Sequence, residues 1–284
     1  MKHFYVIANP MKEGAAQTAE RIADYLRKRG ATCEGSAQKK HCTGYGKGYT
    51  DTACIPADTQ CVITLGGDGT LIQAARDLVD LELPLIGVNL GNLGYLTQVS
   101  KGEKIAPMLD ALLEDNFTLE KRMMLEGRVV GENGVRKGIA LNDIVLTRKD
   151  VLQMLKFQVF LNGEYFNEYM ADGMIAATPT GSTAYNLSAG GPIVAPGAKL
   201  IVLTPICSHS INSRSIVLSP EDKISLRLLQ QRDGEQTAVF DGDQVLELGC
   251  GDTLEICRSQ SCTTLIQLRN VSFLENLRSK MDRI

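Results

Sequence analysis

Short apolar runs alternate with stretches of helical periodicity through the first 116 residues of the chain. The runs are rich in β-branched residues and predict buried strands, whereas apolar residues three or four positions apart predict amphipathic helices. Gly30 stands where the first of these helices would end, in the place of a C-cap. The predicted strands are 4–8, 61–65 and 84–89, and the predicted helices are 15–29, 71–79 and about 102–113. Their alternation predicts an α/β domain with a mainly parallel sheet.

The pattern changes near residue 117, where short strand-like segments separated by turn residues such as Asn162-Gly163 replace the helices. These segments are 122–130, 138–146, 155–161, 174–178, 215–218, 224–229, 236–241 and 253–256. We therefore expect an α/β domain over residues 1–116 and a mostly β domain over 117–270. The last segment, 271–284, has a helical pattern and is expected to pack back on the first domain.

Composition narrows the classes of function. The 284 residues are 44% hydrophobic, enough for one large or two ordinary domains, and the net charge of −3 gives no general basic surface for nucleic acid. No apolar segment approaches 18 residues, so we expect no membrane span. The chain opens on a strand-like run without a signal-peptide pattern, and its eight cysteines form no Cys-x-x-Cys pair. We therefore expect a cytoplasmic protein with reduced thiols.

The segment 35–57 is rich in Gly, Thr and Lys and lacks periodicity, which predicts a long surface loop. Its basic residues are either simply solvated or close over a polyanion. A zinc site is a further alternative here, although the Cys and His spacings match no common ligand pattern, and we assign no metal ligand. The residues concerned are Cys33, Lys39, Lys40, His41, Cys42, Lys47 and Cys54.

A glycine-rich turn joins the predicted strand 61–65 to the predicted helix 71–79. Gly66, Gly67 and Gly69 permit unusual backbone angles and leave room for a ligand, while Asp68 or Thr70 can cap the helix. The free N–H groups and the helix dipole favour an anion such as phosphate.

The carboxylate of Asp68 is unexpected in a turn that favours phosphate. It is compatible with a plain helix cap, with a magnesium-associated group, or with the acceptor of a hydroxyl proton, and only the last makes this a kinase turn. An ordinary strand-to-helix turn remains the simpler reading. Neither Gly-x-Gly-x-x-Gly nor the P-loop pattern is present.

Two further glycine-rich segments complete the candidate site. The segment 90–97 follows the strand 84–89, so both early turns lie at the carboxyl edge of the sheet, where ligands bind in such folds. The segment 178–192 combines hydroxyls, small residues and glycines, and its Tyr185 can stack on a ring. A plain connector between strands is the alternative for that segment.

Taken together, these motifs resemble the NAD kinase family. The matching residues are Gly66-Gly67-Asp68-Gly69-Thr70, the 90–95 turn, Asn142-Asp143, Asp172-Gly173, 178–192 and Phe240-Asp241-Gly242-Asp243. The resemblance spans roughly residues 60 to 245 in the family's order. Thr-Pro-Thr-Gly-Ser-Thr-Ala-Tyr is long and specific, whereas Gly-Gly-Asp-Gly-Thr is shared with lipid kinases.

The resemblance implies phosphorylation of the adenosine ribose 2′-hydroxyl of NAD, with ATP as donor and a divalent metal, Mg²⁺, as cofactor. It implies a homodimer or homotetramer. From the charge and the lack of a long apolar segment, we expect no nucleic-acid or membrane partner. Asp68 would be the general base or orienting group, and Gly66, Gly67, Gly69 and Thr70 would surround the transferred phosphate. The residues implied to bind NAD are Tyr95, Asn142, Asp143, Asp172, Thr183, Ala184, Tyr185, Ser188 and Asp241.

Three positions depart from the family pattern, and three other functions compete with it. Asp143 stands where the family usually has Glu, Asp243 stands at a Gln position, and Ser215 replaces a Pro after Arg214. The competing functions are a lipid or small-metabolite kinase, a dinucleotide sensor without chemistry, and a serine hydrolase. The last lacks Gly-x-Ser-x-Gly, and its candidate base, His209, reads as a loop residue.

Overall fold

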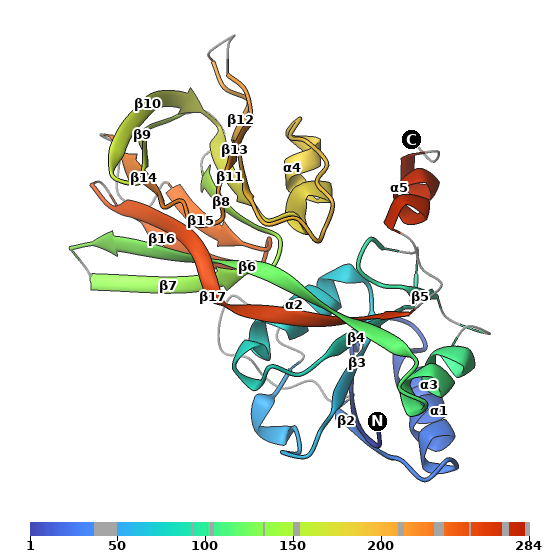
Figure 1. The fold of residues 1–284 in the computed structure, drawn as a ribbon. Coiled ribbons are helices and arrows are strands. Elements are labelled where there is room, and N and C mark those ends of the chain that lie inside the picture. Colours follow the sequence, from blue (N-terminus) through green and yellow to red (C-terminus); the bar gives the residue numbers. More distant parts are fainter. Residues whose placement is uncertain are drawn as a thin grey trace. The chain divides into compact units, whose positions relative to one another are not determined.

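The computed structural model forms two compact units, one of Met1–Lys121 with Cys262–Ile284 and one of Arg122–Ser261 (Figure 1). Two long strands, β6 (Phe117–Gly131) and β17 (Thr253–Leu268), contribute to both units. The structure describes residues 1–36, 50–91, 94–100, 102, 105–132, 134–149, 154–209, 213–229, 236–249, 251–268 and 273–281.

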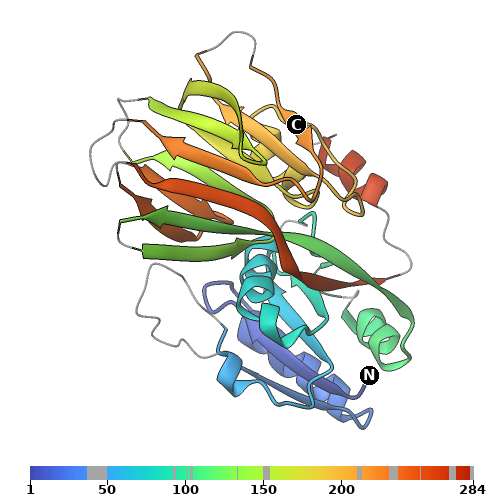
Figure 2. The ribbon, with the colours of Figure 1, turned by 60° about the vertical axis from the view of Figure 1, so that its left-hand side comes forward.

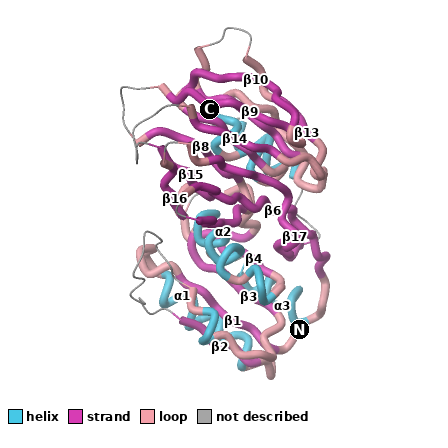
Figure 3. Tube along the Cα trace, turned by 90° about the vertical axis from the view of Figure 1, so that its left-hand side faces the viewer, coloured by secondary structure: helices cyan, strands magenta, loops and turns pink. Residues whose placement is uncertain are grey.

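The first unit is built on a parallel sheet with the order β17-β4-β3-β1-β2, and Figure 3 shows its strands β4, β3, β1 and β2 side by side. On the edge of β4 opposite β3, β5 pairs with Val88 and Asn89, and Leu265 of β17 pairs with Leu85. The α/β prediction with a mainly parallel sheet is confirmed. The strands are β1 (His3–Ala8), β2 (Thr32–Ser36), β3 (Cys61–Gly66), β4 (Leu85–Asn89) and β5 (Val99–Ser100).

Helices cover both faces of this sheet. Ile22 and Leu26 of α1 share one apolar core cluster with α3 and the inward residues of β1 and β3. On the opposite face, Leu71 of α2 reaches the backbone of Gly87, where a Cβ would come within 2.8 Å of its Cδ1. The helices of the whole unit are α1 (Ala15–Arg27), α2 (Asp68–Asp77), α3 (Ile105–Leu113) and α5 (Phe273–Met281), with short 3-10 turns η1 (Thr52–Cys54) and η2 (Val79–Leu81).

The end of α1 follows the sequence-based expectation. Gly30 has a φ of 75°, its N–H donates to Arg27 O at 3.0 Å, and Ala31 N–H donates to Leu26 O at 3.1 Å. These two bonds make a Schellman motif around a left-handed glycine. The chain therefore leaves the helix where the glycine was expected to end it.

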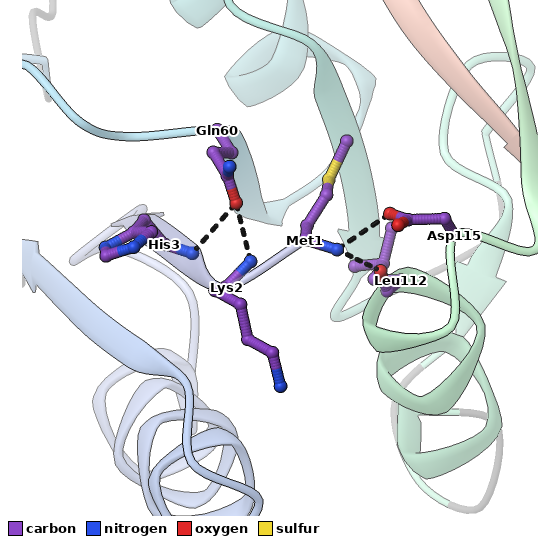
Figure 4. Close-up of polar contacts among 6 residues, drawn as sticks. All are labelled: Met1, Lys2, His3, Gln60, Leu112 and Asp115. Carbon is purple, nitrogen blue, oxygen red and sulfur yellow. Dashed lines mark hydrogen bonds and ion pairs between the residues drawn. The ribbon is translucent and has the colours of Figure 1, made fainter.

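The start of β1 is fixed by two polar contacts (Figure 4). The Met1 amino group donates to Leu112 O at 3.2 Å and pairs with Asp115 Oδ1 at 2.7 Å. Gln60 Oε1 accepts from the next two backbone N–H groups at 2.6 and 3.3 Å. The first strand is thereby tied both to the end of α3 and to the residue before β3.

The second unit consists of antiparallel strands in two sheets, which confirms the prediction of a mostly β domain. One sheet has the order β13-β12-β11-β8-β15-β16; in the other, β10, β9 and β14 lead to β17, and β6 pairs with β17 and β7. The long β6 (green) and β17 (red) lie side by side in Figure 2. The remaining strands are β7 (Gly134–Ala140), β8 (Asp143–Arg148), β9 (Leu155–Leu161), β10 (Glu164–Ala171), β11 (Gly173–Ala177), β12 (Ile201–Ile206), β13 (Ile216–Leu218), β14 (Ile224–Leu228), β15 (Gln236–Phe240) and β16 (Gln244–Leu248).

Residues of both sheets, among them the fully buried Phe157 of β9 and Phe240 of β15, share one apolar core. The predicted Asn162-Gly163 turn joins β9 to β10 with φ values of 53° and 85°, as a type I′ hairpin requires. Among the described residues, no helix has the length and apolar character needed to cross a membrane.

The predicted strand 138–146 is wrong in one respect, because the chain forms two strands there, β7 and β8, with a break at Leu141-Asn142. The apolar pattern continues through the break. What interrupts the ladder is the carboxylate of Asp241, which takes the N–H groups of this segment.

Candidate functional site

The first glycine turn has the predicted position but not the predicted cap. β3 ends at Gly66 and α2 begins at Asp68, with Gly67 as an N-cap that has no side chain to accept a bond. Thr70 Oγ1 instead accepts from Asn9 Nδ2 at 3.2 Å. The expectation that Asp68 or Thr70 caps the helix is therefore wrong, because both side chains are bonded to residues outside it.

The glycines of this turn differ in what surrounds them. A Cβ at Gly66 would lie 2.1 Å from Thr70 Oγ1, so this glycine permits close packing inside the turn. Apart from the neighbouring residues and the helix backbone, no described atom lies within 4 Å of the corresponding position at Gly67 or Gly69. Open space therefore lies beside the N-terminus of α2, where the helix dipole and free N–H groups favour an anion.

The carboxylate of Asp68 joins the first glycine turn to the second. Its Oδ2 accepts from Tyr95 N at 2.6 Å, and its Oδ1 accepts from Thr97 N at 3.0 Å and from Thr97 Oγ1 at 2.9 Å. A Cβ at Gly94 would lie 1.8 Å from Oδ1 and 2.2 Å from Oδ2. Only glycine at position 94 leaves room for this arrangement.

Thr97 is a functional candidate that the sequence reasoning did not single out. Its buried hydroxyl donates to Asp68 and accepts from Asn89 Nδ2 at 3.1 Å and from Gly94 N at 3.2 Å. A Thr three residues after a glycine is the only local signal for such a contact. Its role depends on Asp68, which lies 29 positions away in the chain.

The bonding of Asp68 determines which of its oxygens remains available. A carboxylate offers about four acceptor positions, two on each oxygen. Among the described residues, Oδ1 receives both bonds from Thr97, whereas Oδ2 receives only the bond from Tyr95. Oδ2 therefore keeps one acceptor position for a hydroxyl group.

The ring of Tyr95, the other site residue expected in the first unit, is half-buried. Lys280 Nζ of α5 lies 4.8 Å from the centroid of this ring, within the range of a cation–π contact.

In the second unit, Asp241 organises the backbone of the predicted Asn142-Asp143 pair. Its carboxylate accepts from the N–H groups of Leu141 at 2.9 Å, Asn142 at 2.7 Å and Asp143 at 3.2 Å. Asp241 itself has a φ of 51° and donates its N–H to Asp143 O at 3.0 Å. The structure thus brings together these predicted residues, and it gives Asp241 a positioning contact that the sequence did not predict.

The side chains of this pair are unusual for buried groups. Asp143 is only 5% exposed, and its burial, followed by the nearby charge of Asp241, raises the pKa of its carboxyl to about 7. Asn142 Oδ1 is buried, and no described donor lies within hydrogen-bonding distance of it. An unsatisfied buried carbonyl is costly, so this atom indicates a ligand that donates a hydrogen bond.

The predicted residues of the segment 178–192 lie on its accessible side. Thr183 ends a short 3-10 turn, η3 (Gly181–Thr183), Tyr185 and Ser188 lie in a four-residue helix, α4 (Tyr185–Ser188), and Ala184 joins the two. Between them, Ser182 and Asn186 are fully buried. The accessible ones are the half-buried Thr183 and Ala184 and the exposed Tyr185 and Ser188.

The remaining sequence-based expectations concern Asp172, a possible metal site and the basic loop. Asp172 is partly exposed and forms an ion pair of 2.9 Å with Arg148 at the end of β8. Among the described residues no cluster of three potential metal ligands occurs, and the described cysteines are free thiols. The basic loop interpretation and the zinc alternative fall largely outside the described residues, on Lys39, Lys40, His41, Cys42 and Lys47.

Comparisons with known proteins agree across the whole chain. The model of the ATP-NAD kinase N-terminal domain matches residues 4–117, and that of the ATP-NAD kinase C-terminal domain matches residues 141–268. An NAD kinase of Agathobacter rectalis is 44% identical, with 99% of each chain covered. An NAD kinase of Lachnospira eligens is 40% identical, covering 99% of this chain and 100% of the relative.

Solved structures share the fold at lower identity. Yeast NADH kinase complexed with NADH gives a TM-score of 0.84 at 22% identity, covering 99% of this chain and 88% of the other. An NAD kinase from Archaeoglobus fulgidus in complex with ATP gives 0.74 at 23% identity, with 100% of both chains covered. With both family models matched and relatives at 40% identity or more over almost its full length, the chain belongs to the NAD kinase family.

Proposed function

We propose that this chain is an NAD kinase, which transfers the terminal phosphoryl group of ATP to the 2′-hydroxyl of the adenosine ribose of NAD. The products are NADP and ADP. Membership of the family supports the reaction, and the observation that carries it is the turn around Asp68. There an anion-favouring helix terminus with open space at Gly67 and Gly69 adjoins a carboxylate that keeps one acceptor position.

The phosphate side of the reaction uses mainly backbone groups. Phosphoryl transfer depends on positioning and on compensation of charge, and the backbone at Gly67 and Gly69 can approach a phosphate without interference from side chains. Gly66 and Thr70 hold the turn in shape through their mutual contact. We assign these four residues to the donor phosphate.

Asp68 acts on the hydroxyl. The ribose oxygen attacks the terminal phosphorus of ATP, the bond from that phosphorus to the bridging oxygen breaks, and the hydroxyl proton passes to Asp68 Oδ2 and then to water. The bonds to Tyr95 and Thr97 hold the carboxylate at one orientation while this occurs. Because Oδ1 receives two bonds from Thr97, the proposal assigns the hydroxyl to Oδ2.

The NAD molecule is bound by the remaining predicted residues. Asn142 Oδ1 accepts a bond from the ligand, which satisfies a buried atom, and Asp143 accepts a bond from a hydroxyl. Asp241 acts as a positioning residue for both, and Arg148 orients the carboxylate of Asp172. In the second unit, Thr183, Ala184, Tyr185 and Ser188 complete the NAD surface through their accessible side. In the first unit, Tyr95 is the residue that we assign to NAD.

The divalent metal is proposed to enter with ATP. Magnesium is commonly held by one or two carboxylates, substrate phosphates and water, and the described residues offer no cluster of three ligands. The phosphates and water would therefore supply most ligands, and the metal would offset the phosphate charge.

We also propose that the enzyme is a cytoplasmic homodimer or homotetramer. Light scattering of the purified protein tests the oligomeric state, and fractionation of the producing cell tests the location.

Formation of NADP by the purified protein separates this function from a dinucleotide sensor. The protein is incubated with Mg²⁺, ATP and NAD, and NADP is detected with a dehydrogenase that accepts only NADP. Turnover that requires all three components supports the proposal. NAD binding in calorimetry without NADP formation would make the chain a sensor, and neither binding nor turnover would reject both functions.

A further inference from the structure

A chain of hydrogen bonds, which runs from the buried Asn186 and Thr204 to the half-buried Ser215, supports the segment that carries Tyr185 and Ser188. We propose that Asn186, Thr204 and Ser215 form a support that positions the accessible side of this segment for NAD. The inference rests on the proposed function, because it assigns positioning residues to its NAD surface. These three residues, which we call the support, lie outside the motif positions expected to contact NAD.

Asn186 uses both ends of its amide to close the segment on itself. Its Nδ2 donates to Ser182 O and to Pro192 O, both at 3.1 Å, and its Oδ1 accepts from Thr204 Oγ1 at 2.7 Å. The side chain is fully buried. It therefore joins the beginning and end of the segment to strand β12.

A helix as short as α4 depends on such an anchor. Its four residues are too few for a helix that is stable by itself in water. Gly191 approaches so closely that a Cβ there would lie 2.0 Å from Asn186 Oδ1. The orientation of Tyr185 and Ser188, which lie one and two residues from Asn186, is therefore set largely by the buried amide.

Thr204 and Ser215 extend the support away from the segment. Thr204 Oγ1 lies 2.7 Å from Asn186 Oδ1 and 2.9 Å from Ser215 Oγ. A hydroxyl has one proton, and Asn186 Oδ1 can only accept, so Thr204 donates to Asn186 and Ser215 donates to Thr204. Such a chain of hydroxyls polarises each bond and strengthens it.

Ser215 is the member of the support at which this chain departs from the family pattern. It stands where the family pattern has proline, and proline has no hydroxyl that could continue the chain of bonds. The departure at position 215 therefore adds a bond, directed through Thr204 to the residue that anchors α4.

Two hydrogen bonds of Ser182 keep the segment folded when the support is weakened. Ser182 Oγ lies 2.7 Å from Pro179 O and accepts from Val194 N at 3.0 Å. Loss of the Thr204 hydroxyl removes neither bond. We therefore expect its loss to shift the accessible side of the segment without unfolding the unit.

Steady-state kinetics of Thr204→Val and Thr204→Ser test the proposal. Valine keeps the shape of threonine but leaves Asn186 Oδ1 without its donor, so KM for NAD should rise on the order of tenfold, as for one lost buried hydrogen bond. Serine restores the hydroxyl and should return KM for NAD to within about twofold of wild type. KM for ATP and kcat should change little, because the bonds of Asp68 involve none of these residues.

Two further variants define the outcome. Ser215→Ala should raise KM for NAD by about two- to threefold, and Val217→Ala, at an exposed position of β13, should leave it unchanged. An unchanged KM for NAD in both Thr204→Val and Ser215→Ala would overturn the support. So would parallel losses in kcat and both KM values, which indicate general destabilisation. If Thr204→Val is insoluble, the KM for NAD of Ser215→Ala, compared with that of Val217→Ala, tests the proposal.

Calorimetric binding of NAD to the same proteins separates this inference from the proposed function. A wild-type protein that binds NAD but forms no NADP overturns the proposed function. In that case the Kd for NAD of each variant replaces KM, and the same changes in Kd support or overturn the role of the three residues. A wild-type protein that does not bind NAD overturns both.

Discussion

Gly94→Ala offers a strong test of the contact between the two glycine turns. The added Cβ would lie 1.8 Å from Oδ1, 2.1 Å from Cγ and 2.2 Å from Oδ2 of Asp68, so every atom of the carboxylate group is in conflict with it. Contacts below 3.0 Å essentially never occur for a real Cβ, and the carboxylate must move by about 1 Å to escape. A displacement of this size at the reacting hydroxyl is expected to lower kcat by about 10²–10³-fold.

A double-mutant cycle shows whether the loss acts through Asp68. In an Asp68→Ala background the carboxylate is absent, so Gly94→Ala should cause little further loss of kcat. Gly197→Ala is a matched control, because no described atom lies within 4 Å of a Cβ at that position. The assay is initial-rate formation of NADP with thermal melting of each variant. A folded Gly94→Ala protein with kcat near that of wild type would refute this account of Asp68.

Three further predictions follow from the site. Asp68→Asn should lower kcat by about 10²–10⁴-fold, because the amide cannot take the hydroxyl proton. It should also lower the melting temperature, because the amide NH₂ would face the N–H donor of Tyr95 or Thr97. A normal kcat and a normal melting temperature would contradict this prediction. Asp241→Ala should reduce the free energy of unfolding by at least ~2 kcal/mol and raise KM for NAD, since three N–H groups lose their acceptor; denaturant unfolding and kinetics measure both, and no change in either would contradict it. The carboxyl of Asp143 has a pKa raised to about 7, so between about pH 4 and 7 it holds a proton in the folded chain that the unfolded chain releases. The free energy of unfolding of the wild type should therefore fall, relative to that of Asp143→Asn, by on the order of 3 kcal/mol as the pH rises from about 4 to 7. A difference in unfolding free energy that does not depend on pH would exclude the raised pKa.

Much of the first unit was predictable because its signals are local. The strands β1, β3 and β4 are apolar runs buried on both faces, and the Schellman turn at Gly30 depends on residues within a few positions of it. The strand β2 was not predicted. Thr32–Ser36 lacks an apolar pattern and lies at the edge of the sheet, where its Gly35 is required by proximity to Val6 O.

The contacts that shape the candidate site could not be predicted, because they join distant parts of the chain. Asp241 interrupts a continuous apolar run about a hundred residues earlier, at Leu141 and Asn142. The sequence shows that Asp68 is unusual in its turn, but not that Thr97 and Tyr95 occupy most of its acceptor positions. The motifs indicate candidate residues, and the structure distinguishes those that are accessible from those that hold others in place.

The central claim is that Asp68 directs the 2′-hydroxyl of the adenosine ribose toward the terminal phosphate of ATP. The most direct measurement is the position of the new phosphate, determined by phosphorus and proton NMR of the product formed from NAD, ATP and Mg²⁺, beside a parallel reaction with Asp68→Ala. We predict one phosphate on the adenosine 2′-oxygen, ADP in equal amount, and at least a hundredfold slower formation by the variant. A phosphate at any other position, or an Asp68→Ala protein as fast as wild type, would contradict the account.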